Sequence, residues 1–242
     1  PPMLALRADL LDFPAPPPWA DPADDAPGVR WRPGHWLVVG DDGRIAAVHG
    51  PGWTPPPGST VEDHAGRLLL PGFIDTHVHS AQMEVVASYG TELLDWLQRY
   101  TFPAERAFAD AGYATAAAER FVGALLAHGT TTAVVFPTVH KTSIDALFSA
   151  AHDRGMRLVA GKVLLDRHAP DGLRDDVLQA ERDCIDLIDR WHGTGRLAFA
   201  VTVRFAPTST PAQLAMAGAL CRADPTLYMQ THVAENRDEV RW

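Results

Sequence analysis

From Gly66 onward, short and almost continuously apolar runs alternate with longer amphipathic segments. This alternation predicts an α/β fold with helices between parallel strands, because strands that are covered on both faces are apolar throughout. The predicted strands cover residues 68–79, 131–138, 157–166, 197–205 and 227–235. A (β/α)8 TIM-type barrel typically takes ~250 residues. About five βα units therefore predict the N-terminal part of such a barrel, truncated from a longer chain.

Glycines and capping residues mark the ends of the predicted helices. Gly129, Gly155 and Gly193 each follow an amphipathic segment and predict its C-terminus. The Ser-Thr-Pro sequence at 209–211 predicts the cap and first turn of a further helix. The last residues, "ENRDEVRW", also read as the opening turn of a helix.

The first 66 residues have a different character, with many Pro, Gly and Trp residues and short apolar runs. In "HWLVVGDDGRIAAVHG", Asp42 and Gly43 predict a hairpin turn between two strands. The Pro-rich segment 13–28 predicts an irregular surface loop, since proline donates no ladder hydrogen bond. We therefore expect residues 1–66 to form part of a small β-sandwich and residues 67–242 to form the barrel portion.

Charge and cysteine content narrow the possible partners and the compartment. With 21 basic and 30 acidic residues the formal net charge is -9, which argues against nucleic acid or an anionic membrane as partner and favours a small neutral ligand. No apolar run reaches the roughly 20 residues that span a bilayer. Cys184 and Cys221 have neither metal-ligand nor redox spacing, so we expect a reducing, cytoplasmic location.

The most informative motif is "LLLPGFIDTHVHSAQ", in which an apolar run leads into two histidines. Alternate side chains share a face of a strand, so His77 and His79 point the same way at the strand's C-terminal end, where barrel enzymes keep their active sites. Two imidazoles suit zinc, although a bare H-x-H is equally consistent with hydrogen bonds to loops. His232, at the end of the last predicted strand, favours the metal.

Three further residues are candidates for substrate chemistry. Glu235 follows His232 by three residues and is placed to move protons for metal-activated water, or else it is a solvated charge that opens a helix. Arg204 and Phe205 end the fourth predicted strand, and a planar donor fork beside a flat apolar ring suits a planar heteroaromatic ligand. The alternative for Arg204, a structural ion pair with a neighbouring acid, stays equally open.

The motifs "PGFIDTHVH" and "THVAE" resemble the metal-dependent amidohydrolase superfamily. Within it, "HSAQ", "LLDWLQRYTFPAE", "GTTTAVVFPTVH", "VRFAPT" and "HVAENRDEV" are similar to the guanine deaminases, from Leu70 to Trp242. The resemblance implies a βα barrel with a small β-sandwich, a homodimer, and zinc-dependent hydrolysis of guanine to xanthine and ammonia. It implies one Zn²⁺ per chain on His77, His79 and His232, with Glu235 as proton shuttle. It also implies purine contacts from Gln82, Arg204 and Phe205, beside His232.

Two alternatives remain at this point. Some related barrels bridge two metals with a carboxylated lysine, and Lys162 is the candidate, but that lysine usually ends the fourth strand, where this chain has Arg204. A mononuclear site is therefore favoured, and His140 is the other histidine that could face the mouth. The same motifs also fit a deaminase of another purine, a pterin or a triazine, or an inactive truncated barrel that only binds a ligand.

Overall fold

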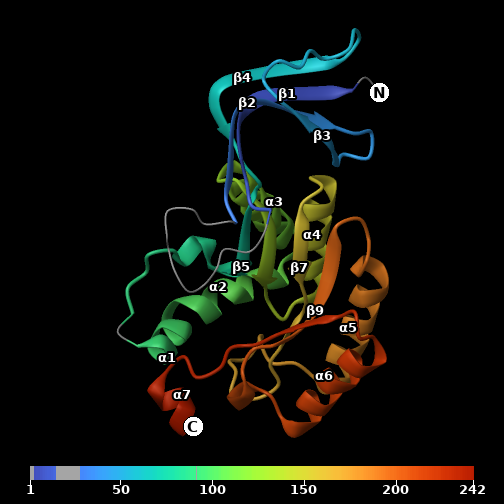
Figure 1. The fold of residues 1–242 in the computed structure, drawn as a ribbon. Coiled ribbons are helices and arrows are strands. Elements are labelled where there is room, and N and C mark those ends of the chain that lie inside the picture. The colour runs from blue at the N-terminus through green and yellow to red at the C-terminus, as the bar shows by residue number, and fades with distance from the viewer. Residues whose placement is uncertain (1–2, 15–27, 91) are drawn as a thin grey trace. The chain divides into compact units, whose positions relative to one another are not determined.

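The computed structural model describes residues 3–14, 28–90 and 92–242 and divides the chain into two units (Figure 1). The first unit ends at Pro71 and the second begins at Gly72, so the division lies beyond the boundary at residue 66 that composition predicted. The reason is that Leu68 and Leu69 pair with the first strand of the N-terminal sheet. Most of the Pro-rich segment for which a surface loop is predicted, residues 15–27, lies outside the described residues.

The first unit contains one four-stranded sheet with the order β3-β2-β1-β4. Its strands are β1 (Leu4–Asp12), β2 (Arg30–Val39), β3 (Ile45–His49) and β4 (Thr60–Leu69). Strand β1 is antiparallel to β2 and parallel to β4. The predicted hairpin is confirmed, since Gly43 has a φ of 74° in the turn between β2 and β3 and the Gly40 amide donates to the Arg44 carbonyl at 2.8 Å.

The second unit is built on a parallel six-stranded sheet, which confirms the predicted α/β class. Along the sheet the order is β10-β9-β7-β6-β5, with β8 also paired to β9. The strands are β5 (Phe73–His79), β6 (Thr130–Phe136), β7 (Arg157–Ala160), β8 (Val163–Leu164), β9 (Leu197–Val203) and β10 (Tyr228–Gln230). The first predicted strand, 68–79, is therefore two strands that are interrupted at Leu70, Pro71 and Gly72 and belong to different sheets.

Four long helices pack on this sheet (Figure 1). They are α3 (Ala111–Ala127), α4 (Lys141–Asp153), α5 (Val177–Trp191) and α6 (Pro211–Ala223). Helices α3, α4 and α5 end just before the three glycines that predicted their ends, and Thr210 caps α6 through the Gln213 amide. The shorter helices are η1 (Ser80–Val85), α1 (Leu93–Trp96), η2 (Leu97–Thr101), α2 (Phe102–Arg106), η3 (Ala107–Ala109), η4 (Ala206–Thr208) and α7 (Arg237–Arg241). None of the helices in the described ranges has the length and apolarity to cross a membrane.

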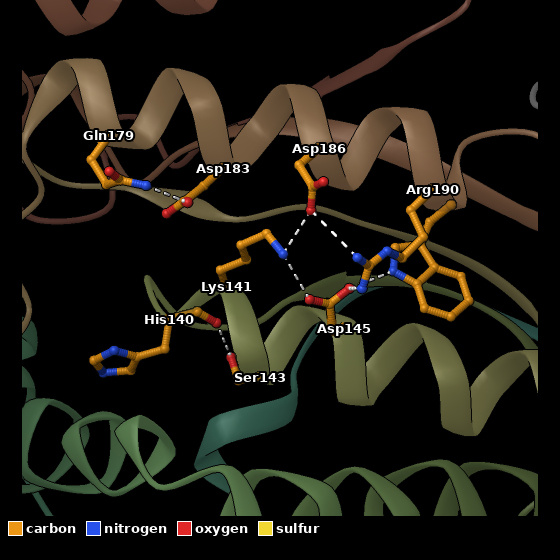
Figure 2. Close-up of polar contacts among 9 residues, drawn as sticks. His140, Lys141, Ser143, Asp145, Gln179, Asp183, Asp186 and Arg190 are labelled. Carbon is orange, nitrogen blue, oxygen red and sulfur yellow. Dashed lines mark hydrogen bonds and ion pairs between the residues drawn. The ribbon is translucent and has the colours of Figure 1, made fainter.

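A polar network joins α4 to α5 (Figure 2). Lys141 donates to Asp145 one turn along its own helix at 3.1 Å, and it lies 2.7 Å from Asp186 of α5. Asp145 also accepts hydrogen bonds from Arg190 and from the Trp191 indole. Charged groups that are partly exposed stabilise little one by one, so this network mainly fixes which faces of the two helices meet.

The third predicted strand, 157–166, is broken at Gly161 and Lys162 into β7 and β8. A Cβ on Gly161 would lie 1.8 Å from the Ala200 carbonyl oxygen of β9, so only glycine lets the two backbones approach this closely. Gly161→Ala is therefore expected to lower the free energy of unfolding of the full-length protein by about 1–3 kcal/mol or more, as measured by denaturant titration.

The matched control is the same substitution at Gly123, inside α3. A Cβ there meets no atom within 4 Å, and the backbone is helical. Gly123→Ala is expected to raise the free energy of unfolding by about 0.5–1 kcal/mol, since alanine loses less backbone entropy in a helix. Equal effects of the two substitutions would show that the close approach at Gly161 does not limit stability.

Candidate active site

Three histidines meet at the C-terminal ends of the parallel strands. His77 and His79 alternate along β5, and His232 follows β10 by two residues, so it lies in the loop and not on the predicted strand. The three Nε2 atoms form a triangle whose edges are each 3.2 Å. Within the described ranges these residues form a group of side chains that could hold a metal ion together.

The hydrogen bonds of His232 orient its ring so that one nitrogen is available to a metal ion. Its Nδ1 lies 2.9 Å from the Arg204 carbonyl oxygen, which accepts the Nδ1 proton and leaves Nε2 with a free lone pair directed at the other two rings. The same carbonyl accepts the His232 backbone amide at 3.1 Å and so fixes the loop. Nitrogen donors 3.2 Å apart are close enough for all three imidazoles to hold one small cation, and imidazole nitrogens are ligands that suit zinc.

For His79 and His232, burial favours the neutral form that a metal ligand needs. Burial, together with the neighbouring His232 and His77, lowers the pKa of His79 to about 3. Burial is also the main cause that lowers the pKa of His232, against the opposing influence of its hydrogen bond to the Arg204 carbonyl. The donor set therefore fits a divalent cation with nitrogen preference, as expected for zinc.

A pocket of about 170 Å³ opens beside the triangle. Six of the predicted site residues line it: His79, Gln82, Arg204, Phe205, His232 and Glu235. The apolar part of the lining, which the sequence analysis did not predict, comes from α1 and the start of η2 and consists of Leu93, Leu94, Trp96 and Leu97. Their only sequence signal was the quoted motif "LLDWLQRYTFPAE", to which no role could be attached. The pocket thus combines an apolar lining with a few polar groups, as ligand sites commonly do.

Glu235 lies on a tightly held turn between His232 and α7. Its side chain is exposed, lines the pocket and is close enough to raise the pKa of His232 electrostatically. The Glu239 carboxylate accepts the backbone amides of residues 234, 235 and 236 at 3.1, 2.8 and 3.3 Å. Ala234 takes a left-handed φ of 56° in this turn. Glu239 was missed at the sequence level, although an Asn followed three residues later by Glu signals a capping box.

Arg204 combines the two interpretations that its sequence context left open. It lines the pocket, and its Nη1 also donates to both carboxylate oxygens of Glu105, at 2.9 and 2.8 Å. Both side chains are buried, with 3% and 1% exposed. The Phe102 ring lies 5.0 Å from the guanidinium carbon. Glu105 is a further residue that the sequence analysis missed, although it ends the quoted "YTFPAE" motif.

Lys162 and His140 stay outside the three-histidine group. Lys162 is buried and donates to Asp175 at 2.5 Å, so its amine is engaged in an ion pair. Burial, helped by nearby Lys162, lowers the pKa of His140, whose ring points away from the Asp145 network in Figure 2. Neither residue joins the triangle in the described part of the chain, which favours a single metal ion there.

Comparison with known proteins agrees with this geometry. Residues 68–242 match the model of the amidohydrolase family. The chain is 50% identical to guanine deaminase of Escherichia coli (strain K12) over 182 residues, which are 75% of this chain and 42% of that protein. It is 40% identical over 210 residues to a probable guanine deaminase of Deinococcus radiodurans, covering 84% of this chain and 48% of the relative. The chain thus spans about half the length of the curated relatives it matches.

The fold comparison reaches further along the chain. The structure of E. coli guanine deaminase superposes with a TM-score of 0.91 and 42% identity, covering 97% of this chain and 54% of that one. A guanine deaminase structure from C. acetobutylicum with guanine bound in its active site gives a TM-score of 0.85 at 27% identity, covering 98% and 54%. With the family model matched over most of its length, the chain belongs to the amidohydrolase family.

Proposed function

We propose that this chain carries the metal-binding and purine-binding side of an enzyme that hydrolyses guanine to xanthine and ammonia. The observation that carries the proposal is the triangle of His77, His79 and His232 beside a pocket with a fixed arginine and a free carboxylate. The similarity to guanine deaminases, one of them with guanine bound, supports the choice of substrate. The chain spans about half the length of these relatives, so the activity of the whole protein is a proposal to be tested on the full-length protein.

In the proposed reaction the three histidines would hold the metal and Glu235 would transfer protons. Zinc held by the three imidazoles would supply Lewis-acid activation of a water molecule near neutral pH. Glu235 would take one proton from the attacking water and deliver it to the ring nitrogen next to the amino-bearing carbon. It would then carry the second proton, from the added hydroxyl group, to the amino group, which leaves as ammonia. Water adds, ammonia leaves and the carbon becomes a carbonyl, so the atoms balance without another reactant.

The purine would be bound by the polar and the apolar residues that line the pocket. The Arg204 guanidinium and the Gln82 amide can donate to the carbonyl oxygen and ring nitrogens at one edge of guanine. Phe205 and Trp96 offer flat surfaces for the ring. Such contacts orient the amino-bearing carbon toward the activated water, and orientation is a large part of the catalytic effect.

The full-length protein is expected to release ammonia and xanthine from guanine in equal amounts. The assay should include adenine, a pterin and an amino-triazine at matched concentrations, since the same metal chemistry serves all four. Faster turnover of one of these compounds would reassign the substrate. Binding of guanine without turnover would instead favour a protein that only binds its ligand.

The wider setting of this site is part of the same proposal. We propose that the parallel sheet belongs to a (β/α)8 barrel and that the first unit contributes to a small β-sandwich. The parallel order of the sheet and the match to guanine deaminase structures support the barrel. The two free cysteines support a reducing cytoplasm, and the family resemblance supports a homodimer with one zinc per chain.

A further inference from the structure

The Glu105–Arg204 pair joins two walls of the pocket that are distant in sequence. Glu105 lies on α2, which continues from the helical segment that supplies the apolar wall. Arg204 follows β9 at the mouth of the sheet. The two side chains are 99 residues apart and are joined by two hydrogen bonds to a single amino group, Nη1. The carboxylate therefore fixes where the guanidinium plane lies relative to the wall.

The Nε and Nη2 groups of Arg204 are available to donate hydrogen bonds to a ligand in the pocket. Among the described residues, neither Nε nor Nη2 of Arg204 has a protein hydrogen-bond partner, and the residue lines the pocket. An arginine in free solution samples many rotamers, and ordering such a side chain on binding costs affinity. Here the hydrogen bonds to the Glu105 carboxylate and the contact with the Phe102 ring, both from α2, have already ordered it.

We propose that Glu105 is a positioning residue for substrate binding, which holds the Arg204 guanidinium so that its free edge faces the polar edge of the purine. The inference rests on the proposed function, since it assumes that a purine occupies this pocket. Glu105 acts through Arg204 and touches neither the metal nor the substrate. Its effect is therefore expected in KM and much less in kcat.

The link from Arg204 to the metal site runs through a different atom. The carbonyl oxygen of Arg204, and not its side chain, accepts the Nδ1 proton of His232. A change at Glu105 that disturbs only the guanidinium should leave this backbone contact and the three-histidine triangle in place. Metal content thus separates a positioning role from a general loss of structure.

The test is a double-mutant cycle in the full-length protein with Glu105→Gln, Arg204→Met and the combined variant. Arg204→Met and Glu105→Gln are each expected to raise KM for guanine about 10- to 100-fold, the range for a lost hydrogen bond to a charged group. In the Arg204→Met background, Glu105→Gln should change kcat/KM by less than about twofold, because its route to the substrate is already gone. Metal content should equal that of the unaltered protein in all three.

Two more variants keep the test decisive if Glu105→Gln folds poorly. Glu105→Asp keeps the charge but shortens the reach by one methylene, so KM should rise less than with Gln and more than in the unaltered protein. Glu119→Gln removes the partner of Arg154 elsewhere on the molecule and should leave KM unchanged. The combined Glu105→Gln, Arg204→Met variant contains no unpaired buried charge and should fold.

Three results would overturn the inference. The first is a normal KM for guanine in both Glu105→Asp and Glu105→Gln, together with a raised KM in Arg204→Met. That result would overturn the role of Glu105 and leave the proposed function unaffected. The second is a further large loss of kcat/KM when Glu105→Gln is added to Arg204→Met. Absence of guanine turnover by the unaltered protein would overturn the proposed function and this inference together.

Discussion

Glu235→Gln is expected to reduce guanine turnover by at least about a hundredfold while zinc content and ligand affinity survive. General acid–base catalysis contributes roughly 10²–10⁴-fold, and in the proposed mechanism one carboxylate serves several proton transfers. Glutamine nearly preserves the size of the side chain, and the backbone of residue 235 is held independently by Glu239. The loss should therefore report proton transfer alone, measured as kcat beside metal content and affinity for a xanthine-like ligand.

Asp238→Asn offers a matched control on the same turn. Asp238 is exposed and pairs with Arg241, away from the pocket lining. Its neutralisation should leave kcat within about twofold of normal, since it removes only an exposed ion pair. If Glu235→Gln loses zinc, then Glu235 is a ligand or supports one. Near-normal kcat in that variant would assign the proton transfers to another residue.

His79→Ala is expected to abolish stable metal binding and to lower turnover by at least about a thousandfold, because in the proposed mechanism a bound metal would bring the pKa of water near neutrality. Even residues that merely orient a ligand affect metal affinity about 10- to 100-fold, so loss of a ligating imidazole should exceed that. The Nε2 atom of His79 lies 3.2 Å from both other Nε2 atoms, so this side chain is one corner of the three-histidine triangle. The measurements are elemental analysis and turnover after metal-free purification and zinc titration.

His152→Ala is the control for the loss of an imidazole. His152 is exposed on α4 and is not one of the three converging histidines. Its removal should leave about one zinc per chain, the stoichiometry that a set of three histidines favours for a mononuclear site. Two metals per chain in the unaltered protein would contradict that assignment, as would a His79→Ala variant that keeps full metal content.

Features with a short range along the chain were predictable from local chemistry. The H-x-H spacing puts His77 and His79 on one face of β5 whatever surrounds them, since side chains alternate along a strand. Gly129, Gly155 and Gly193 all have positive φ just beyond helix ends, as their positions predicted. The alternation of apolar runs and amphipathic segments also indicated a parallel sheet. Strands that helices cover on both faces are apolar throughout, and this can be read from each segment alone.

Strand boundaries were less predictable, because an apolar run does not show which sheet it joins. Leu68 and Leu69 continue the apolar run toward β5 but pair with β1, and the chain leaves that sheet after Leu69. The run 157–166 also looks continuous, yet it breaks where Gly161 meets the Ala200 carbonyl. In both cases the deciding contact lies on another strand.

The sequence by itself determined the alternating α/β pattern and the placement of His77 and His79 on one face of a strand, since these follow from local periodicity. Only the tertiary structure decided that Arg204 pairs with Glu105 and also lines the pocket, that α1 forms the apolar wall, and that Glu239 holds the turn carrying Glu235. The physical reason is the range of the interactions. A buried carboxylate must be paired, but its partner can lie 99 residues away, and folding alone brings the two together.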